Sequence, residues 1–333
     1  MAEFSLLLII VLTLAVVFDF INGFHDTANA VATVISTRVL SPLVAILMAA
    51  GLNFLGALSG TAVAKTIGSG IVGSNVPQEV AIAALLGAII WNLFTWYFGI
   101  PSSSSHALIG GLVGGGIAAA GINNVQWPVL LQKVIIPLVT SPLAGFFAGL
   151  LLMKLILSLF ARMSPGRVNS FFRRTQVLSS AFMAFSHGSN DAQKTMGIIT
   201  LALISAHIIP AKPFVVPIWV ITVSAIAMAL GTAAGGRRII KTMGTKLVDL
   251  TPVQGFAAET AAASVIEVAS RFGYPLSTTH VISSSILGVG AGKRFKTVRW
   301  LIAGRIIQTW ILTIPGCAFI AWGSYLLINL IFH

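Results

Sequence analysis

Two short polar segments interrupt long apolar runs of this sequence, and each carries an aspartate three residues after a glycine. Residues 22–29 read NGFHDTAN and residues 187–194 read HGSNDAQK. A charged side chain at the centre of a bilayer costs roughly 2.5–3.5 kcal/mol, so Asp26 and Asp191 are expected to have a function there. We expect the helix to unwind beside Gly23 and Gly188, so that freed carbonyls join Asp and Asn oxygens in a site for Na⁺ or a proton.

The predicted cation ligands come from these two segments and from one acid in a later apolar run. They are Asn22, Asp26, Asn190, Asp191 and Glu259. His25 supports the first segment, and ligation or proton relay through it is an alternative. A purely structural alternative pairs Asp191 with Lys194. Because the Gly-x-x-Asp pattern occurs twice at matching places, we favour the functional interpretation.

A second pair of motifs is rich in hydroxyl groups. Residues 101–106 read PSSSSH and residues 275–280 read PLSTTH. Each proline ends one apolar run and the next run starts after the hydroxyls, so both clusters are expected at helix N-termini. Free backbone N–H groups and the helix dipole attract anions there, which suits a small tetrahedral oxyanion.

The predicted anion ligands are the two hydroxyl clusters and two polar residues of the first motif pair. They are Asn29, Ser103, Ser104, Ser105, Lys194, Ser277, Thr278 and Thr279. The alternative is that the hydroxyls only cap helices. His106 and His280 are expected to brace the two clusters by hydrogen bonds.

The composition indicates the medium around these motifs. Of 333 residues, 56% are apolar and 8% are charged, against about 25% charged in a typical soluble domain. A net charge of +12 often indicates nucleic-acid binding, but so apolar a chain is expected in a lipid bilayer and with no nucleic-acid partner. The single cysteine, Cys317, excludes a disulfide framework, and no permanently bound cofactor is expected.

The charges also predict the topology. Basic residues cluster in loops 162–176, 237–250 and 292–299, which the positive-inside rule places in the cytoplasm. Counting crossings from these loops places both termini outside. The same count makes residues 80–122 and 253–291 re-entrant hairpins.

The two halves therefore repeat in opposite orientations. Residues 1–161 form the first repeat with a broken helix over 4–35, residues 162–176 form a basic linker, and residues 177–333 form the second repeat with a broken helix over 177–205. We predict an all-α polytopic membrane protein with two inverted-topology repeats, each with a broken helix and a re-entrant helical hairpin. Such repeats are typical of secondary transporters, whose sites lie near the membrane midplane.

These motifs resemble those of the inorganic phosphate transporter (PiT) family. The family's paired Gly-x-Asn-Asp-x-x-Asn motifs are matched at 23–29 and 188–194, its Pro-x-Ser-Ser/Thr-Ser/Thr-His motifs at 101–106 and 275–280, and its Glu-Thr pair at 259–260. His25 stands where the family has asparagine. The resemblance implies symport of inorganic phosphate into the cell with Na⁺ in many members and H⁺ in others. It also implies a homodimer in the cytoplasmic membrane.

Other functions make different demands on the sequence. Sulfate is an alternative substrate on the same scaffold, and an anion channel is a further alternative. An intramembrane serine hydrolase is disfavoured because Ser105 and His106 are adjacent and the Gly-x-Ser-x-Gly elbow is lacking. We therefore predict a secondary active transporter and not an enzyme.

Overall fold

The computed structural model describes residues 5–71 and 77–332, and over these residues the chain forms helices and turns but no β-strand. The first half contains α1 (Leu6–Ser36), α2 (Pro42–Ala57), α3 (Ala62–Gly70), α4 (Gln78–Phe98), α5 (Ser104–Ala120), the 3₁₀-helix η1 (Ile122–Asn124), α6 (Trp127–Leu130), the π-helix η2 (Leu131–Ile135) and α7 (Ile136–Leu159). The second half contains α8 (Pro165–Ser205), α9 (Ile218–Ala234), α10 (Arg237–Lys241), the π-helix η3 (Thr242–Lys246), α11 (Pro252–Arg271), α12 (Thr278–Lys293), the 3₁₀-helix η4 (Phe295–Thr297) and α13 (Trp300–Phe332). The all-α prediction is confirmed, although the expected helix start at residue 4 lies outside the described residues.

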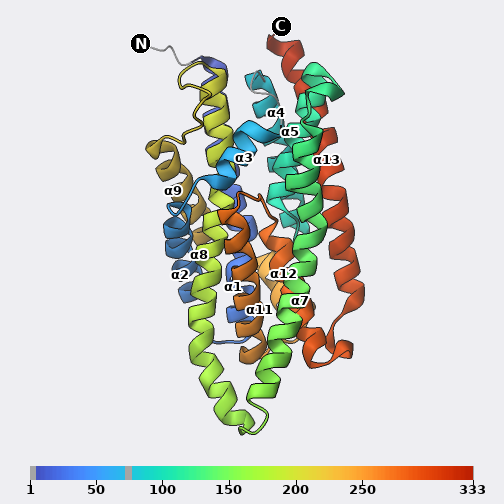
Figure 1. Ribbon diagram of the computed structural model, residues 1–333. Helices are drawn as coiled ribbons and strands as arrows, with labels where there is room; N and C mark the ends of the chain where they lie inside the picture. Colours follow the sequence, from blue (N-terminus) through green and yellow to red (C-terminus); the bar gives the residue numbers. More distant parts are fainter. Residues whose placement is uncertain (1–4, 72–76, 333) are drawn as a thin grey trace.

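The helix contacts of the two halves correspond. Helix α1 packs on α9 as α8 packs on α2, and α5 packs on α13 as α12 packs on α7. Helices of the first half therefore pack on helices of the second half in corresponding pairs, an arrangement that fits inverted repeats. Helix α1 begins and α13 ends at one end of the molecule, and the α7–α8 turn lies at the other end (Figure 1).

Several helices have the length and composition of membrane spans. These are α1, α4, the continuous run Trp127–Leu159 and α13, and two bent helix pairs bring the number to six. Large apolar side chains on the outer face of α13, such as Leu301, Ile311 and Phe319, are exposed. A soluble monomer rarely exposes so much contiguous apolar surface, so these faces fit contact with lipid.

The two predicted helical hairpins are present. Helices α4 and α5 form the first, with Gly99 in the left-handed conformation (φ 66°) ending α4. Helices α11 and α12 form the second, and Gly273 (φ 69°) has the same conformation after α11. Glycine favours such helix ends because it lacks a Cβ atom. The first hairpin occupies the upper part of Figure 1 and the second the lower part.

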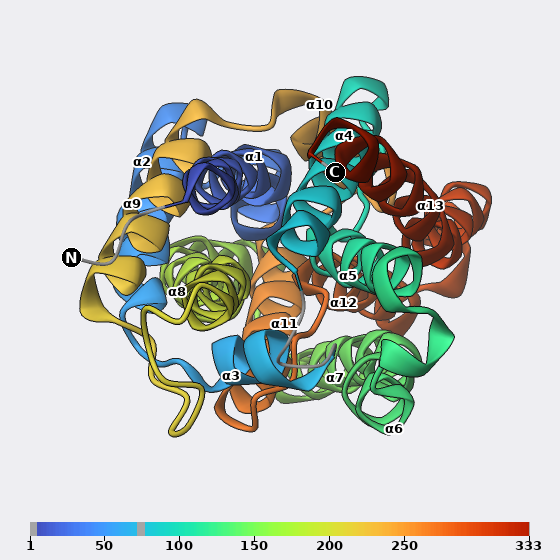
Figure 2. The same cartoon turned by 90° about the horizontal axis from the view of Figure 1, so that it is seen from above.

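The turns of the hairpins meet between the two halves of the molecule. The Ser105 hydroxyl donates a hydrogen bond of 2.9 Å to the carbonyl of Leu276. The ring centroids of His106 and His280 are 4.9 Å apart. Seen from above, α5 lies over α12 (Figure 2), and the side view shows α5 in the upper part of the molecule and α12 in the lower part (Figure 1). The two helix N-termini therefore converge, as the sequence predicted.

The prediction of broken helices at the Gly-x-x-Asp segments is wrong. Helix α1 runs unbroken through residues 22–29 and α8 through residues 187–194. The glycines serve helix packing instead. A Cβ atom at Gly23 would lie 2.9 Å from the Cα atom of Gly231 in α9, and one at Gly188 would lie 2.5 Å from the Cα atom of Asn53 in α2. A side chain at either position would separate two crossing helices.

The bends lie one element further along each repeat. The pair Pro42–Ala57 and Ala62–Gly68 bends by 73°, and the pair Ile218–Ala234 and Arg237–Lys246 bends by 62°. These bends turn the chain from the long helices α1 and α8 towards the hairpins. Each repeat therefore consists of a straight helix, a bent pair, a hairpin and a long final helix.

Candidate functional site

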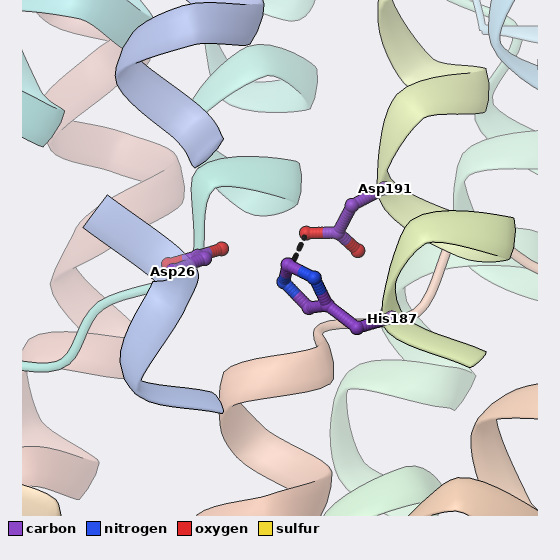
Figure 3. Close-up of side chains that lie close together, drawn as sticks. All are labelled: Asp26, His187 and Asp191. Atoms are coloured by element: carbon purple, nitrogen blue, oxygen red, sulfur yellow. Dashed lines mark ion pairs between the residues drawn. The ribbon is translucent and has the colours of Figure 1, made fainter. Parts of the chain in front are cut away.

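Helices α1 and α8 carry the acids of the two sequence motifs and run antiparallel. The hydroxyl of Ser180, early in α8, donates a 3.3 Å hydrogen bond to the Ala30 carbonyl, late in α1. Further along the same pair of helices, Asp26 lies beside His187 and Asp191, with one ligand atom of each within 4.8 Å of the others (Figure 3). All three side chains are buried. The two motifs thus form one cluster, as an inverted repeat requires.

Basic side chains lie beside both aspartates. The Oδ1 atom of Asp26 is 2.6 Å from His25 Nδ1, and His25 Nε2 is 3.0 Å from the Thr95 hydroxyl in α4. The Oδ1 atom of Asp191 is 2.5 Å from Lys194 Nζ, and its Oδ2 atom is 3.6 Å from His187 Nε2. The Asp191–Lys194 contact is the one that the structural alternative expected.

The second hairpin reaches this cluster through its hydroxyls. Thr278, the first residue of α12, donates a 3.3 Å hydrogen bond to Oδ2 of Asp191. The amide of Asn29 donates to the hydroxyls of Thr278 at 3.2 Å and Thr279 at 2.9 Å. Residues from both Gly-x-x-Asp motifs and one hairpin N-terminus therefore share one set of contacts. A small oxyanion at this N-terminus would touch the same groups.

The residues of the hydroxyl clusters have three different roles. Ser103 and Ser277 are N-caps, since each side chain accepts a 3.2 Å hydrogen bond from the backbone N–H three residues later. Ser105 bonds the opposite hairpin. The Ser104 hydroxyl is buried and has no hydrogen-bond partner among the described residues. Ser104 is therefore the hydroxyl of the first hairpin that is best placed for a ligand.

Removing an N-cap hydroxyl should affect stability before it affects binding. We expect Ser103→Ala to lower the free energy of unfolding by about 1 kcal/mol, because one N–H of the first turn of α5 loses its acceptor. Ser104→Ala, which removes a hydroxyl that has no partner in the described part of the chain, should leave stability unchanged and weaken phosphate binding. Thermal unfolding in detergent, with and without phosphate, separates the two effects. Equal loss of stability in both variants would contradict this division.

The histidines of the hairpin motifs pack against each other and against α13. The His280 ring stacks on Trp310, with centroids 4.0 Å apart. The Trp310 indole N–H donates a 3.3 Å hydrogen bond to the carbonyl of Pro101. The hydrogen bonds expected of His280 are not made within the described residues, since both of its ring nitrogens lack partners there, and Nδ1 of His106 lacks one as well. The His280 ring instead packs between the ring of His106 and that of Trp310.

The other three predicted cation ligands make contacts with residues outside the Asp26–His187–Asp191 cluster. Asn190 donates a 2.8 Å hydrogen bond to Ser270, and Asn22 points its amide nitrogen at the Met228 sulfur, 3.9 Å away. The carboxylate of Glu259 accepts hydrogen bonds from three side chains on α1 and α8: Thr33 (2.5 Å), Gln176 (3.1 Å) and Ser179. These donors surround Glu259 and make it a link between α1, α8 and α11.

Residues outside the motifs also build the site. The amide oxygen of Asn53 accepts a 3.1 Å hydrogen bond from His187 Nδ1, and its amide nitrogen donates to the Thr232 hydroxyl at 2.8 Å. Asn53 thereby fixes the His187 ring opposite the aspartates. The signal for such residues is a single polar side chain inside an otherwise apolar helix, which is costly unless it is hydrogen-bonded. Thr95 in α4 carries the same signal.

Comparison with known proteins agrees with this geometry. The sequence profile described as "Phosphate transporter family" matches residues 22–165 and 161–321. The chain belongs to the phosphate transporter family. It is 47% identical to a probable low-affinity inorganic phosphate transporter of Rhizobium meliloti over 98% of this chain and 97% of the relative. It is also 47% identical to a protein of the same name from Bacillus subtilis, over 98% of both chains.

A solved structure shares the architecture of this member of the phosphate transporter family. That structure is titled "The sodium-dependent phosphate transporter" and matches with a TM-score of 0.86 and 27% identity, over 98% of this chain and all of the other. The similarity confirms the all-helical transporter fold. The protein is accordingly a multi-pass membrane transporter of phosphate and not an enzyme.

Proposed function

We propose that the protein is a symporter that carries inorganic phosphate together with Na⁺ across the cytoplasmic membrane into the cell. The observation that carries the proposal is the position of Asp191. One of its oxygens accepts from Thr278 at the N-terminus of α12, and the same carboxylate lies in the cluster with Asp26 and His187. A cation at Asp26 and Asp191 would therefore lie next to an anion at the hairpin N-termini. The sodium dependence of the structural relative supports Na⁺ as the coupling ion.

The coupling has a simple electrostatic origin. Phosphate at the hairpin turns would meet the negative charges of Asp26 and Asp191, and at the low effective dielectric of a buried site that repulsion is strong. A cation bound between the carboxylates removes the repulsion and leaves Lys194, Asn29, Ser104, Thr278 and Thr279 to attract the anion. Each ion therefore raises the affinity of the other, by the same factor in both directions.

The decisive experiment imposes the two candidate driving gradients separately. Purified protein in proteoliposomes should take up labelled phosphate when an inward Na⁺ gradient is present at equal pH inside and outside. Uptake driven only by a pH gradient would assign H⁺ as the coupling ion. Saturable uptake that ignores both gradients would contradict symport, and uptake blocked equally by excess sulfate would extend the substrate to sulfate.

The orientation and assembly follow from the sequence argument and are part of the proposal. The basic loops 162–176, 237–250 and 292–299 face the cytoplasm, and both termini lie outside. Cysteine labelling with a membrane-impermeant reagent at a terminal and a loop position of intact cells checks the orientation. The homodimer stays a prediction, which mass photometry of the detergent-solubilised protein can test.

A further inference from the structure

A fourth buried acid, Asp19, lies on the same face of α1 as the transport cluster. Its residue is 0% exposed, and both of its carboxylate oxygens lack a hydrogen-bond partner among the described residues. Its polar neighbours are the side chains of Asn22 on α1 and Thr195 on α8. The amide oxygen of Asn22 and the hydroxyl of Thr195 also lack partners in the described part of the chain. The Asp19 carboxylate therefore lies at one buried place with the Thr195 hydroxyl and the Asn22 side chain.

Asp19 differs in this respect from the buried acids Asp26, Asp191 and Glu259. Asp26 contacts His25, Asp191 contacts Lys194, and Glu259 accepts three side-chain hydrogen bonds. Lys194 and Asp191 are also within electrostatic range of Asp19, but Lys194 directs its ammonium group to Asp191. A buried carboxylate without a partner is costly, so the site calls for a ligand of positive charge.

We propose that Asp19, Asn22 and Thr195 form a second binding site for a monovalent cation, with Na⁺ as its occupant. Carboxylate, amide and hydroxyl oxygens are hard ligands that suit an alkali cation better than a soft metal. One carboxylate balances one unit charge, whereas a divalent ion would leave excess positive charge in a buried place beside Lys194. The Asn22 amide is held only by a weak contact to the Met228 sulfur at 3.9 Å, so it can turn its oxygen towards the ion.

The proposed site lies to one side of the transport cluster along α1 and α8. Asp19 lies two helical turns before Asp26, and Thr195 lies one turn after Asp191. The proposed cation is therefore next to the transport cluster, on the side of the molecule where α1 begins (Figure 1). Aligning Asp26 with Asp191 places Ala184 opposite Asp19 and Ala30 opposite Thr195. The second repeat lacks the equivalent ligands, so the site occurs on one side of the pseudo-symmetric centre.

The site can be tested by binding alone, without transport. The probe is ²²Na⁺ added to the purified full-length protein in detergent, without phosphate, at constant ionic strength maintained with choline chloride. We expect Asp19→Asn to bind one Na⁺ fewer per protein than the parent. Thr195→Val, which keeps the volume and removes one ligand, should weaken the same binding step about tenfold. It also keeps the proposal testable if Asp19→Asn fails to fold.

Matched variants separate this site from the central one. Asp249→Asn removes an exposed acid that contacts Arg299 and should bind Na⁺ as the parent does. Unchanged Na⁺ binding in Asp19→Asn and Thr195→Val would overturn the inference and identify Asp19 as a protonated acid. The role of this ion in transport rests on the proposed function, whereas its binding to Asp19 does not. If the parent fails to couple phosphate uptake to Na⁺ but Asp19→Asn still loses one bound ion, the proposed function falls and the site stands.

Discussion

Replacing Asp191 with asparagine is expected to abolish phosphate uptake and to lower the free energy of unfolding by about 3–5 kcal/mol. The variant leaves the ammonium group of Lys194, 2.5 Å from the lost charge, buried without a counter-charge. It also removes the carboxylate that accepts from Thr278 and lies beside His187. Uptake of labelled phosphate in proteoliposomes measures the first effect, and thermal unfolding in detergent measures the second.

A double variant separates the lost charge pair from the lost binding site. Asp191→Asn combined with Lys194→Met removes both charges, so most of the lost stability should return. Uptake should not return, because the cation then has only the Asp26 carboxylate in the cluster. Recovery of uptake together with stability would show that Asp191 has a structural role alone, the alternative that the sequence left open.

The helical hairpins could be predicted because their signals are local. In each hairpin, a proline near the end of the first arm is followed within a few residues by Ser or Thr and then by an apolar run. The side chains of Ser103 and Ser277 cap the second arms, as such a pattern favours. The meeting of the two turns was also predictable, because the repeats are inverted and their hairpins enter from opposite sides. The capping residues thus predict where the second arm of each hairpin begins, and the inverted repeat predicts that the two turns meet.

The unbroken course of α1 and α8 could not be predicted in the same way. A glycine beside polar residues favours both a break in a helix and a close crossing of two helices. Which of the two occurs depends on the neighbouring helix, here α9 for Gly23 and α2 for Gly188. That neighbour is distant in sequence, so the local pattern alone gives an ambiguous prediction.

The separation of the acids into distinct sites has the same cause. The sequence groups Glu259 with Asp26 and Asp191 as acids in apolar runs, but Glu259 lies on α11, where its carboxylate accepts from Thr33 on α1 and Ser179 on α8. Asp19 belongs to neither pair of sequence motifs, and its neighbour Thr195 is remote in the sequence, so no local pattern indicates a role for it. The sequence shows which charged residues lie in apolar runs. Which of them contact one another depends on how α1 packs on α8, and the sequence does not show that packing.

Substituting alanine for Gly188 should be one of the most damaging changes outside the charged cluster. In an ordinary helix this change stabilises by up to about 1 kcal/mol. Here the new Cβ atom would lie 2.5 Å from the Cα atom of Asn53, a backbone atom that cannot turn aside. Overpacking of this kind costs about 1–3 kcal/mol, which exceeds the gain. We expect a lower unfolding temperature and severe loss of phosphate uptake, because moving α8 from α2 breaks the Asn53–His187 hydrogen bond.

Gly51 provides the matched control on the partner helix. A Cβ atom at Gly51 in α2 has no heavy atom within 4 Å, so Gly51→Ala should keep uptake and gain a little stability from helix propensity. If Gly188→Ala behaved like Gly51→Ala, the close crossing of α2 and α8 would be contradicted and an unwound segment at Gly188 would again be favoured. If only Gly188→Ala loses uptake and stability, Gly188 is required for the close crossing of α2 and α8 that holds His187 against Asn53.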